Sequence, residues 1–131
     1  MTAINPDLRF RKLWLAIGYL LIVLVIYLSL SSSPVTIDTN LPYEDKLFHF
    51  IAYFVLTFWF MQIYHIRHHV IAWVALFLCL GLTMEYLQGF NSYRYSETAD
   101  MAANTLGVMA GFGLSITPLR YILVKLERYI S

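Results

Sequence analysis

The chain has 131 residues, of which 60% are hydrophobic and 13% are charged, with a mean hydropathy of +0.64 and a net charge of +1. Soluble domains carry about 25% charged residues, so this composition excludes an ordinary soluble domain. The length predicts one domain over residues 1–131, and nothing in the charge indicates a nucleic-acid partner, so we expect none. The single Cys79 lies in an apolar segment, where we expect a small buried hydrophobic residue.

The first apolar segment, Leu13–Leu30, follows the basic residues Arg9, Arg11 and Lys12. Its beginning resembles a secretory signal peptide. However, its length of about 18 apolar residues exceeds the roughly 7–15 of a signal sequence. We therefore predict an uncleaved first membrane helix, ended by the serine-rich loop that follows it.

Three further apolar segments follow in the chain, at Lys46–Tyr64, Val70–Gln88 and Asp100–Thr117. Each approaches the length of about 20 residues that crosses the core of a bilayer. A short histidine-rich stretch at 65–69 separates the second segment from the third. We predict a solvated loop there, because no acid or thiol beside the histidines completes a set of metal ligands.

The fourth segment carries small residues at every fourth position. They are Ala99, Ala103, Gly107 and Gly111. Small residues at this spacing let two helix backbones approach each other closely in a membrane. We therefore predict that the fourth helix packs tightly against a neighbour along this face.

The C-terminal tail, Leu119–Ser131, is predicted to form a short amphipathic helix. Leu119, Ile122, Leu123, Leu126 and Ile130 fall on one helical face, and Arg120, Lys125, Glu127 and Arg128 fall mostly on the opposite face. We expect this helix to lie on the membrane surface. The alternative is a solvated extension of the fourth helix.

Basic residues predict the orientation of the chain, because cytoplasmic segments carry an excess of lysine and arginine. With both termini inside, the inner segments hold Arg9, Arg11, Lys12, Arg67, Arg120, Lys125 and Arg128, and the outer ones hold only Lys46 and Arg94. We therefore expect the N-terminus and the C-terminus in the cytoplasm. The predicted fold class is all-α: a polytopic membrane protein with a bundle of four transmembrane helices plus a short C-terminal amphipathic helix.

Polar residues gather where the last three apolar segments reach the outer surface. They are Asp45, Lys46, His49 and Tyr53 in the second segment, Glu85 and Gln88 in the third, Arg94 in the following loop, and Asp100 and Asn104 in the fourth. An ionisable residue within a bilayer costs about 2.5–3.5 kcal/mol on insertion scales. We therefore expect these side chains to turn inward and pair with one another.

Two interpretations of this outer polar cluster stay open. It could be a network of ion pairs and hydrogen bonds that only locks the helices together. It could instead be a functional site. We favour the site, because the small residues of the fourth segment already provide for helix packing.

The same residues carry a resemblance to a known family. Asp45-Lys46-Leu47-Phe48-His49-Phe50-Ile51-Ala52-Tyr53 resembles the D-K-x-x-H-F-x-x-Y motif of VanZ-like membrane proteins. Glu85-Tyr86-Leu87-Gln88, then Arg94, then Asp100 to Gly107 resemble their second motif: E-x-x-Q, an arginine, then D-x-x-x-N-T-x-G. Both motifs lie within residues 43–113. Thr98-Ala99 departs from the family pattern, where a more apolar approach to the aspartate is usual.

We expect an integral protein of the bacterial cytoplasmic (inner) membrane with a role in the cell envelope. The family is named for a protein associated with resistance to the glycopeptide teicoplanin, and a resistance role for this chain would be an extrapolation from the resemblance. The resemblance implies that the motif residues form a site, but it names no reaction.

The residues themselves suggest a ligand, which is an anionic membrane lipid or a lipid-linked cell-wall precursor. We expect Lys46 and Arg94 to hold its phosphate. Asp45, Tyr53, Gln88 and Asn104 are further candidates for ligand binding, and no cofactor or metal is expected.

The sequence leaves two alternatives to a protein that only binds a lipid or lipid-linked precursor. In an enzyme, His49, Glu85 and Asp100 would be the catalytic residues, with His49 as the general base. In a structural or accessory subunit, the polar cluster would only hold the helices together. Proton-coupled transport is disfavoured, because the inner halves of the predicted helices are nearly all apolar.

Overall fold

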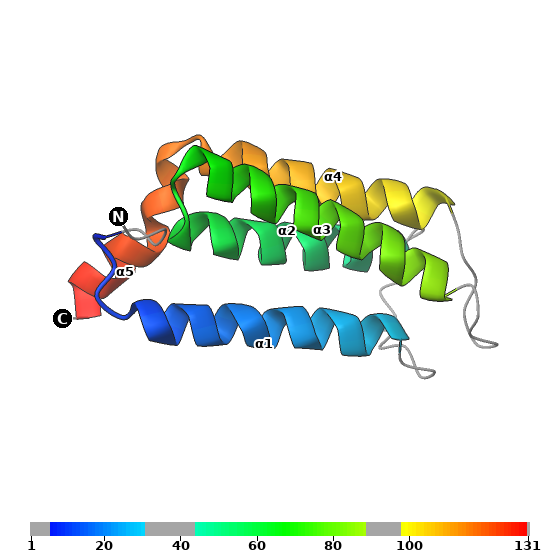
Figure 1. The fold of residues 1–131 in the computed structure, drawn as a ribbon, viewed down its shortest axis with the longest axis horizontal. Helices are drawn as coiled ribbons and strands as arrows, with labels where there is room; N and C mark the ends of the chain where they lie inside the picture. The colour runs from blue at the N-terminus through cyan, green and yellow to red at the C-terminus, as the bar shows by residue number, and fades with distance from the viewer. Residues whose placement is uncertain (1–5, 31–43, 89–97, 131) are drawn as a thin grey trace.

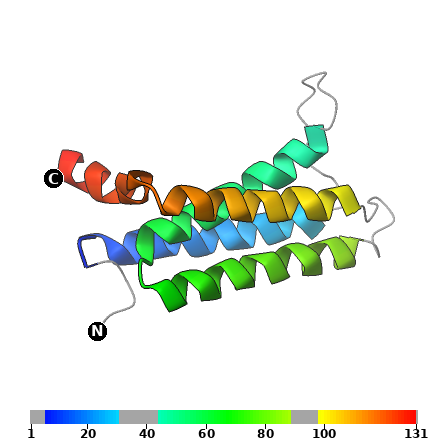
Figure 2. The same ribbon diagram turned by 90° about the horizontal axis from the view of Figure 1, so that it is seen from above.

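The computed structural model describes residues 6–30, 44–88 and 98–130, and the side chains of residues 44–46, 88, 98 and 99 lie outside that description. The elements are α1 (Arg11–Leu30), α2 (Glu44–Ile63), α3 (Arg67–Gln88), α4 (Thr98–Ser115), the 3-10 helix η1 (Pro118–Tyr121) and α5 (Ile122–Ile130). The four long helices run lengthwise through the molecule, with α2 oblique to the others, and α5 and both termini lie at the same end (Figures 1 and 2). The all-helical prediction is confirmed, and the predicted boundaries are shifted by only a few residues.

Two of the four long helices, α1 and α3, are long and apolar enough to cross a membrane. A third span results only if α4 is counted together with η1 and α5, which are bent away from it by 79°. In α2, the apolar stretch Leu47–Ile63 is shorter than a full span. By length and composition, the described residues therefore contain two or three candidate spans, where the sequence predicted four.

The close contact between α2 and α4 depends on two glycines of α4. A Cβ atom at Gly107 would collide with the backbone carbonyl oxygen of Phe50. One at Gly111 would lie 2.9 Å from Cβ of Thr57 and 3.0 Å from the carbonyl oxygen of Phe54. Figure 2 shows α2 crossing obliquely behind α4 at this contact. The predicted small-residue face is thus confirmed at these two positions, and the side chain of Ala99 lies outside the described residues.

Phe60 of α2 joins three helices in the apolar core. Its side chain is fully buried, and its ring stacks on Trp73 of α3 with centroids 4.3 Å apart. Tyr19 of α1 meets the same ring edge-on at 5.9 Å. The prediction for Cys79 is wrong, because this residue is exposed on α3. An apolar helix that faces lipid exposes its outer side chains, so apolar surroundings in sequence do not imply burial.

The start of α3 and the link before it differ from the predicted solvated histidine loop. α3 begins at Arg67, so His68 and His69 belong to its first turn. His65 is half-buried, and its ring meets the Tyr121 ring edge-on at 5.6 Å. Burial, followed by the nearby charge of Arg120, lowers the pKa of His65 below its usual value. Of the three histidines, only His68 is therefore as exposed as the sequence predicted.

A second polar cluster holds α5 against the end of the bundle where both termini lie. The Glu127 carboxylate, buried at 2% exposure, accepts hydrogen bonds from the backbone N–H groups of Arg9 (2.7 Å) and Phe10 (2.8 Å) and from the Trp14 indole (2.6 Å). We call this arrangement the Glu127 clasp. The prediction that placed Glu127 on the polar outer face of the tail is therefore wrong, because Glu127 accepts hydrogen bonds from Trp14 of α1 and from the two residues just before α1.

Gln62, at the last turn of α2, holds the other side of the tail. Its side-chain nitrogen donates to the carbonyl oxygen of Leu119 at 2.8 Å, and its side-chain oxygen accepts from the N–H of Leu123 at 3.2 Å. Because Gln62 is 2% exposed, these bonds satisfy both of its polar atoms in a buried place. α5 is thus fastened to both α1 and α2.

Candidate functional site

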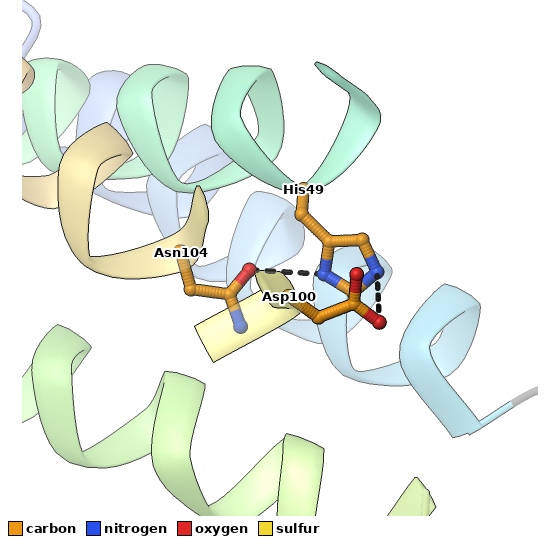
Figure 3. Close-up of polar contacts among 3 residues, drawn as sticks. All are labelled: His49, Asp100 and Asn104. Atoms are coloured by element: carbon orange, nitrogen blue, oxygen red, sulfur yellow. Dashed lines mark hydrogen bonds and ion pairs between the residues drawn. The ribbon is translucent and has the colours of Figure 1, made fainter. Parts of the chain in front are cut away.

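His49, Asp100 and Asn104 meet at the opposite end of the bundle from the termini (Figure 3). His49 lies in the second turn of α2. Asp100 and Asn104 are four residues apart at the start of α4, so they share one helical face. His49 Nδ1 is 2.9 Å from Asn104 Oδ1, and His49 Nε2 is 3.8 Å from Asp100 Oδ2. The side chain of His49 keeps 16% of its surface exposed, against 7% for Asp100.

The two contacts of His49 differ in kind. With the Asn104 oxygen as acceptor, Nδ1 carries a proton and donates it, which fixes the orientation of the ring. Nε2 is then held close to a carboxylate but beyond hydrogen-bond distance from it. A protonated ring would form an ion pair with Asp100, whereas a neutral ring would present a lone pair at Nε2. Either form leaves Nε2 able to take a partner of its own.

Tyr53 and Glu85 are two further buried residues of the predicted site. Tyr53 lies one turn after His49 on α2 and is 1% exposed, and Glu85 on α3 is fully buried. The carboxylate of Glu85 is close enough to the Tyr53 hydroxyl for an electrostatic interaction. At Gly81 of α3, a Cβ atom would lie 3.2 Å from Cβ of Asn104 and 3.6 Å from the Tyr53 ring. Three helices therefore converge behind the histidine.

The structure brings together part of the predicted set. His49 contacts both Asp100 and Asn104, Tyr53 lies one turn from His49 on α2, and Glu85 interacts electrostatically with Tyr53. The remaining predicted residues are outside the description. They are Arg94 and the side chains of Asp45, Lys46 and Gln88. Their participation stays a prediction.

Sequence reasoning missed the Glu127 clasp and the separate hydrogen bonds of Gln62 at the other end of the bundle. Gln62 stands alone as an amide near the end of an apolar segment, a signal that could have predicted a buried hydrogen-bonding role. Glu127 gave no such signal, because its donors come from the other end of the chain. Among the described residues, no three histidine, cysteine, aspartate or glutamate side chains are placed to hold a metal ion.

Comparison with known proteins agrees with this arrangement of motifs. The family described as VanZ/LLP1 matches residues 16–122, which include every position of both motifs. An uncharacterised protein of Schizosaccharomyces pombe is 30% identical over 124 residues, covering 91% of this chain and 74% of the yeast protein. No solved structure matches the chain. With a family match over most of its length, the chain belongs to the VanZ/LLP1 family.

Proposed function

We propose that this protein is an integral membrane protein that binds the phosphate-bearing headgroup of an anionic lipid at the His49 end of its bundle. All four long helices would cross the membrane, with both termini in the cytoplasm. The seven-to-two distribution of basic residues supports this orientation. In a bacterium, the site would then face outward from the cytoplasmic membrane.

The observation that carries the proposal is the position of His49 Nε2. A network built only to lock helices would use both ring nitrogens in hydrogen bonds, because a buried polar atom without a partner is costly. Here Nδ1 is hydrogen-bonded to Asn104, while Nε2 lies 3.8 Å from the Asp100 carboxylate. The His49 side chain is still partly exposed. When the ring is protonated, that nitrogen can donate to a phosphate oxygen.

The basic residues expected beside it supply the charge. Lys46 lies three residues before His49 on α2, and Arg94 lies in the segment that leads into α4. Arginine and lysine are the usual partners of phosphate in proteins. Occurrence of a relative in a yeast favours a lipid common to bacterial and fungal membranes, such as a phospholipid, over a bacterial cell-wall precursor. A link to teicoplanin resistance stays a narrower expectation from the family resemblance.

Native mass spectrometry of the purified protein tests the proposal. We expect the wild type to retain a phospholipid or polyprenyl phosphate, and His49→Gln to retain at least about tenfold less while staying folded. The matched control is His68→Gln at the opposite end, which should retain the wild-type amount. Equal retention by wild type and His49→Gln would contradict the proposal.

The same experiment addresses the two alternatives. A purely structural cluster predicts that the wild type retains no lipid and that His49→Gln melts well below the wild type. An enzyme predicts that the retained lipid changes in mass on incubation. In that case Asp100→Asn, which removes the carboxylate facing Nε2, should keep the lipid but stop the change.

A further inference from the structure

The outward side of α5 carries a continuous apolar strip. Its exposed residues are Ile122, Leu126, Tyr129 and Ile130, with Tyr129 at 89% exposure. The opposite side of the helix, with Leu123, Val124 and Glu127, is buried against the bundle. The face that the sequence treated as one apolar surface is thus divided, and most of its apolar residues point away from the protein.

This strip cannot turn inward. The Glu127 clasp fixes one end of α5 to the start of α1, and Gln62 fixes the beginning of the tail through Leu119 and Leu123. Rotating the helix to bury the strip would break these bonds and expose Leu123 and Val124. The direction in which Leu126 and Tyr129 point is therefore part of the fold.

Basic side chains border the strip. Lys125 and Arg128 are exposed on α5, next to the strip around the helix, and Arg9 and Lys12 are exposed at the start of α1. η1 and α5 together are bent by 79° from α4 and lie at the end of the bundle where both termini are (Figures 1 and 2). A helix that is apolar on one side, basic beside it and placed across the end of membrane helices matches the interface of a bilayer that contains anionic lipids.

We infer that α5 is an in-plane membrane helix whose apolar strip enters the headgroup boundary of the leaflet on the terminal side, and whose bordering lysine and arginine recruit anionic phospholipid there. This surface is separate from the His49 site, and its function does not require that site.

Quenching by spin-labelled lipids tests the placement of α5 in the intact protein. The exposed Cys79 is first replaced by alanine, and an environment-sensitive dye is attached to Leu126→Cys or, as control on the same helix, to Lys125→Cys. The protein is reconstituted into vesicles containing phosphatidylcholine labelled near the headgroup. We expect strong quenching at position 126 and clearly weaker quenching at 125. Equal quenching at both positions would overturn the inference.

Replacing the labelled phosphatidylcholine by the same fraction of labelled phosphatidylglycerol tests the lipid preference. We expect stronger quenching at position 126 with the anionic lipid. A basic residue near an anionic surface contributes an attraction worth about a fivefold local enrichment. Arg128→Gln should therefore lower the phosphatidylglycerol preference up to about fivefold, whereas Arg67→Gln, at the start of α3, should leave it unchanged.

Two results would overturn the inference. Identical quenching by the two lipids would remove the claim for anionic phospholipid. A dye at position 126 that is shielded from lipid and from aqueous iodide, and becomes accessible on dilution, would show that the strip binds a second copy of the chain instead.

Discussion

Gly107→Ala is expected to destabilise the protein by about 1–3 kcal/mol, even though alanine is the better helix former. The added methyl group would collide with the backbone carbonyl oxygen of Phe50, and the N–H of Phe54 lies only 3.0 Å from the same position. Because both are backbone atoms, relief requires α2 and α4 to move apart. Thermal unfolding in mild detergent measures the effect.

Gly113→Ala is the matched control, because it makes the same change on the same helix. Apart from its chain neighbours and the nearby backbone of its own helix, no atom of the described residues lies within 4 Å of a Cβ at Gly113. We therefore expect no loss of stability there and a gain of up to about 1 kcal/mol from helix propensity. If both variants melted at the wild-type temperature, close approach of α2 and α4 would not be a source of stability.

His49 and Asn104 lie on these two helices, so Gly107→Ala should also weaken lipid retention.

Glu127→Ala is expected to cost about 3 kcal/mol, because three N–H donors would lose one charged acceptor. Cavity formation adds to the loss, since Glu127 is buried. Arg128→Ala, on the exposed side of the same helix, should change stability by less than about 0.5 kcal/mol. Equal melting temperatures of the two variants would show that the Glu127 clasp contributes nothing to the stability of the fold.

The contribution of Glu127 should also depend on pH. Burial alone would raise the pKa of its carboxyl group, but the hydrogen bonds from Arg9, Phe10 and Trp14 outweigh it and hold that pKa below the ordinary value of 4.5. Because the pKa is lower in the folded state, the ionised carboxylate stabilises the protein fully at pH values above the ordinary pKa. This stabilisation is lost as the pH falls through the pKa of the folded state.

We therefore expect the difference in melting temperature between the wild type and Glu127→Gln to be constant from pH 7 to about 5.5. It should shrink as the pH falls below 4.5. Comparing the two proteins cancels the titration of the other carboxylates. A difference that stays the same down to pH 3 would show that Glu127 does not bind its partners as a carboxylate.

The helices and the outer cluster were predictable because both depend on local pattern. Apolar segments of near-membrane length fix where each helix begins and ends, and alternating chain direction brings the starts of α2 and α4 to one level. His49, Asp100 and Asn104 could therefore be grouped without a structure. The small-residue spacing of α4 likewise predicted a tight contact, although it could not name α2 as the neighbour.

Features that depend on contacts between distant segments were not predictable. Periodicity placed Glu127 with Lys125 and Arg128, because a helical projection contains no information about donors on another helix. Exposure of Cys79 was missed for a related reason. In a lipid-facing helix, hydrophobic residues occur on the outside as well as in the core, so hydropathy does not separate the two.

The Glu127 clasp has a consequence for how the protein is made. Its three hydrogen bonds join residues 113 to 118 positions apart in the chain, so they form only after Glu127 has been synthesised. During translation, the start of α1 is therefore synthesised long before the carboxylate that accepts its hydrogen bonds. A truncation before residue 127 would therefore remove the hydrogen-bond acceptor of N–H groups at the beginning of the first helix, far in sequence from the truncation itself.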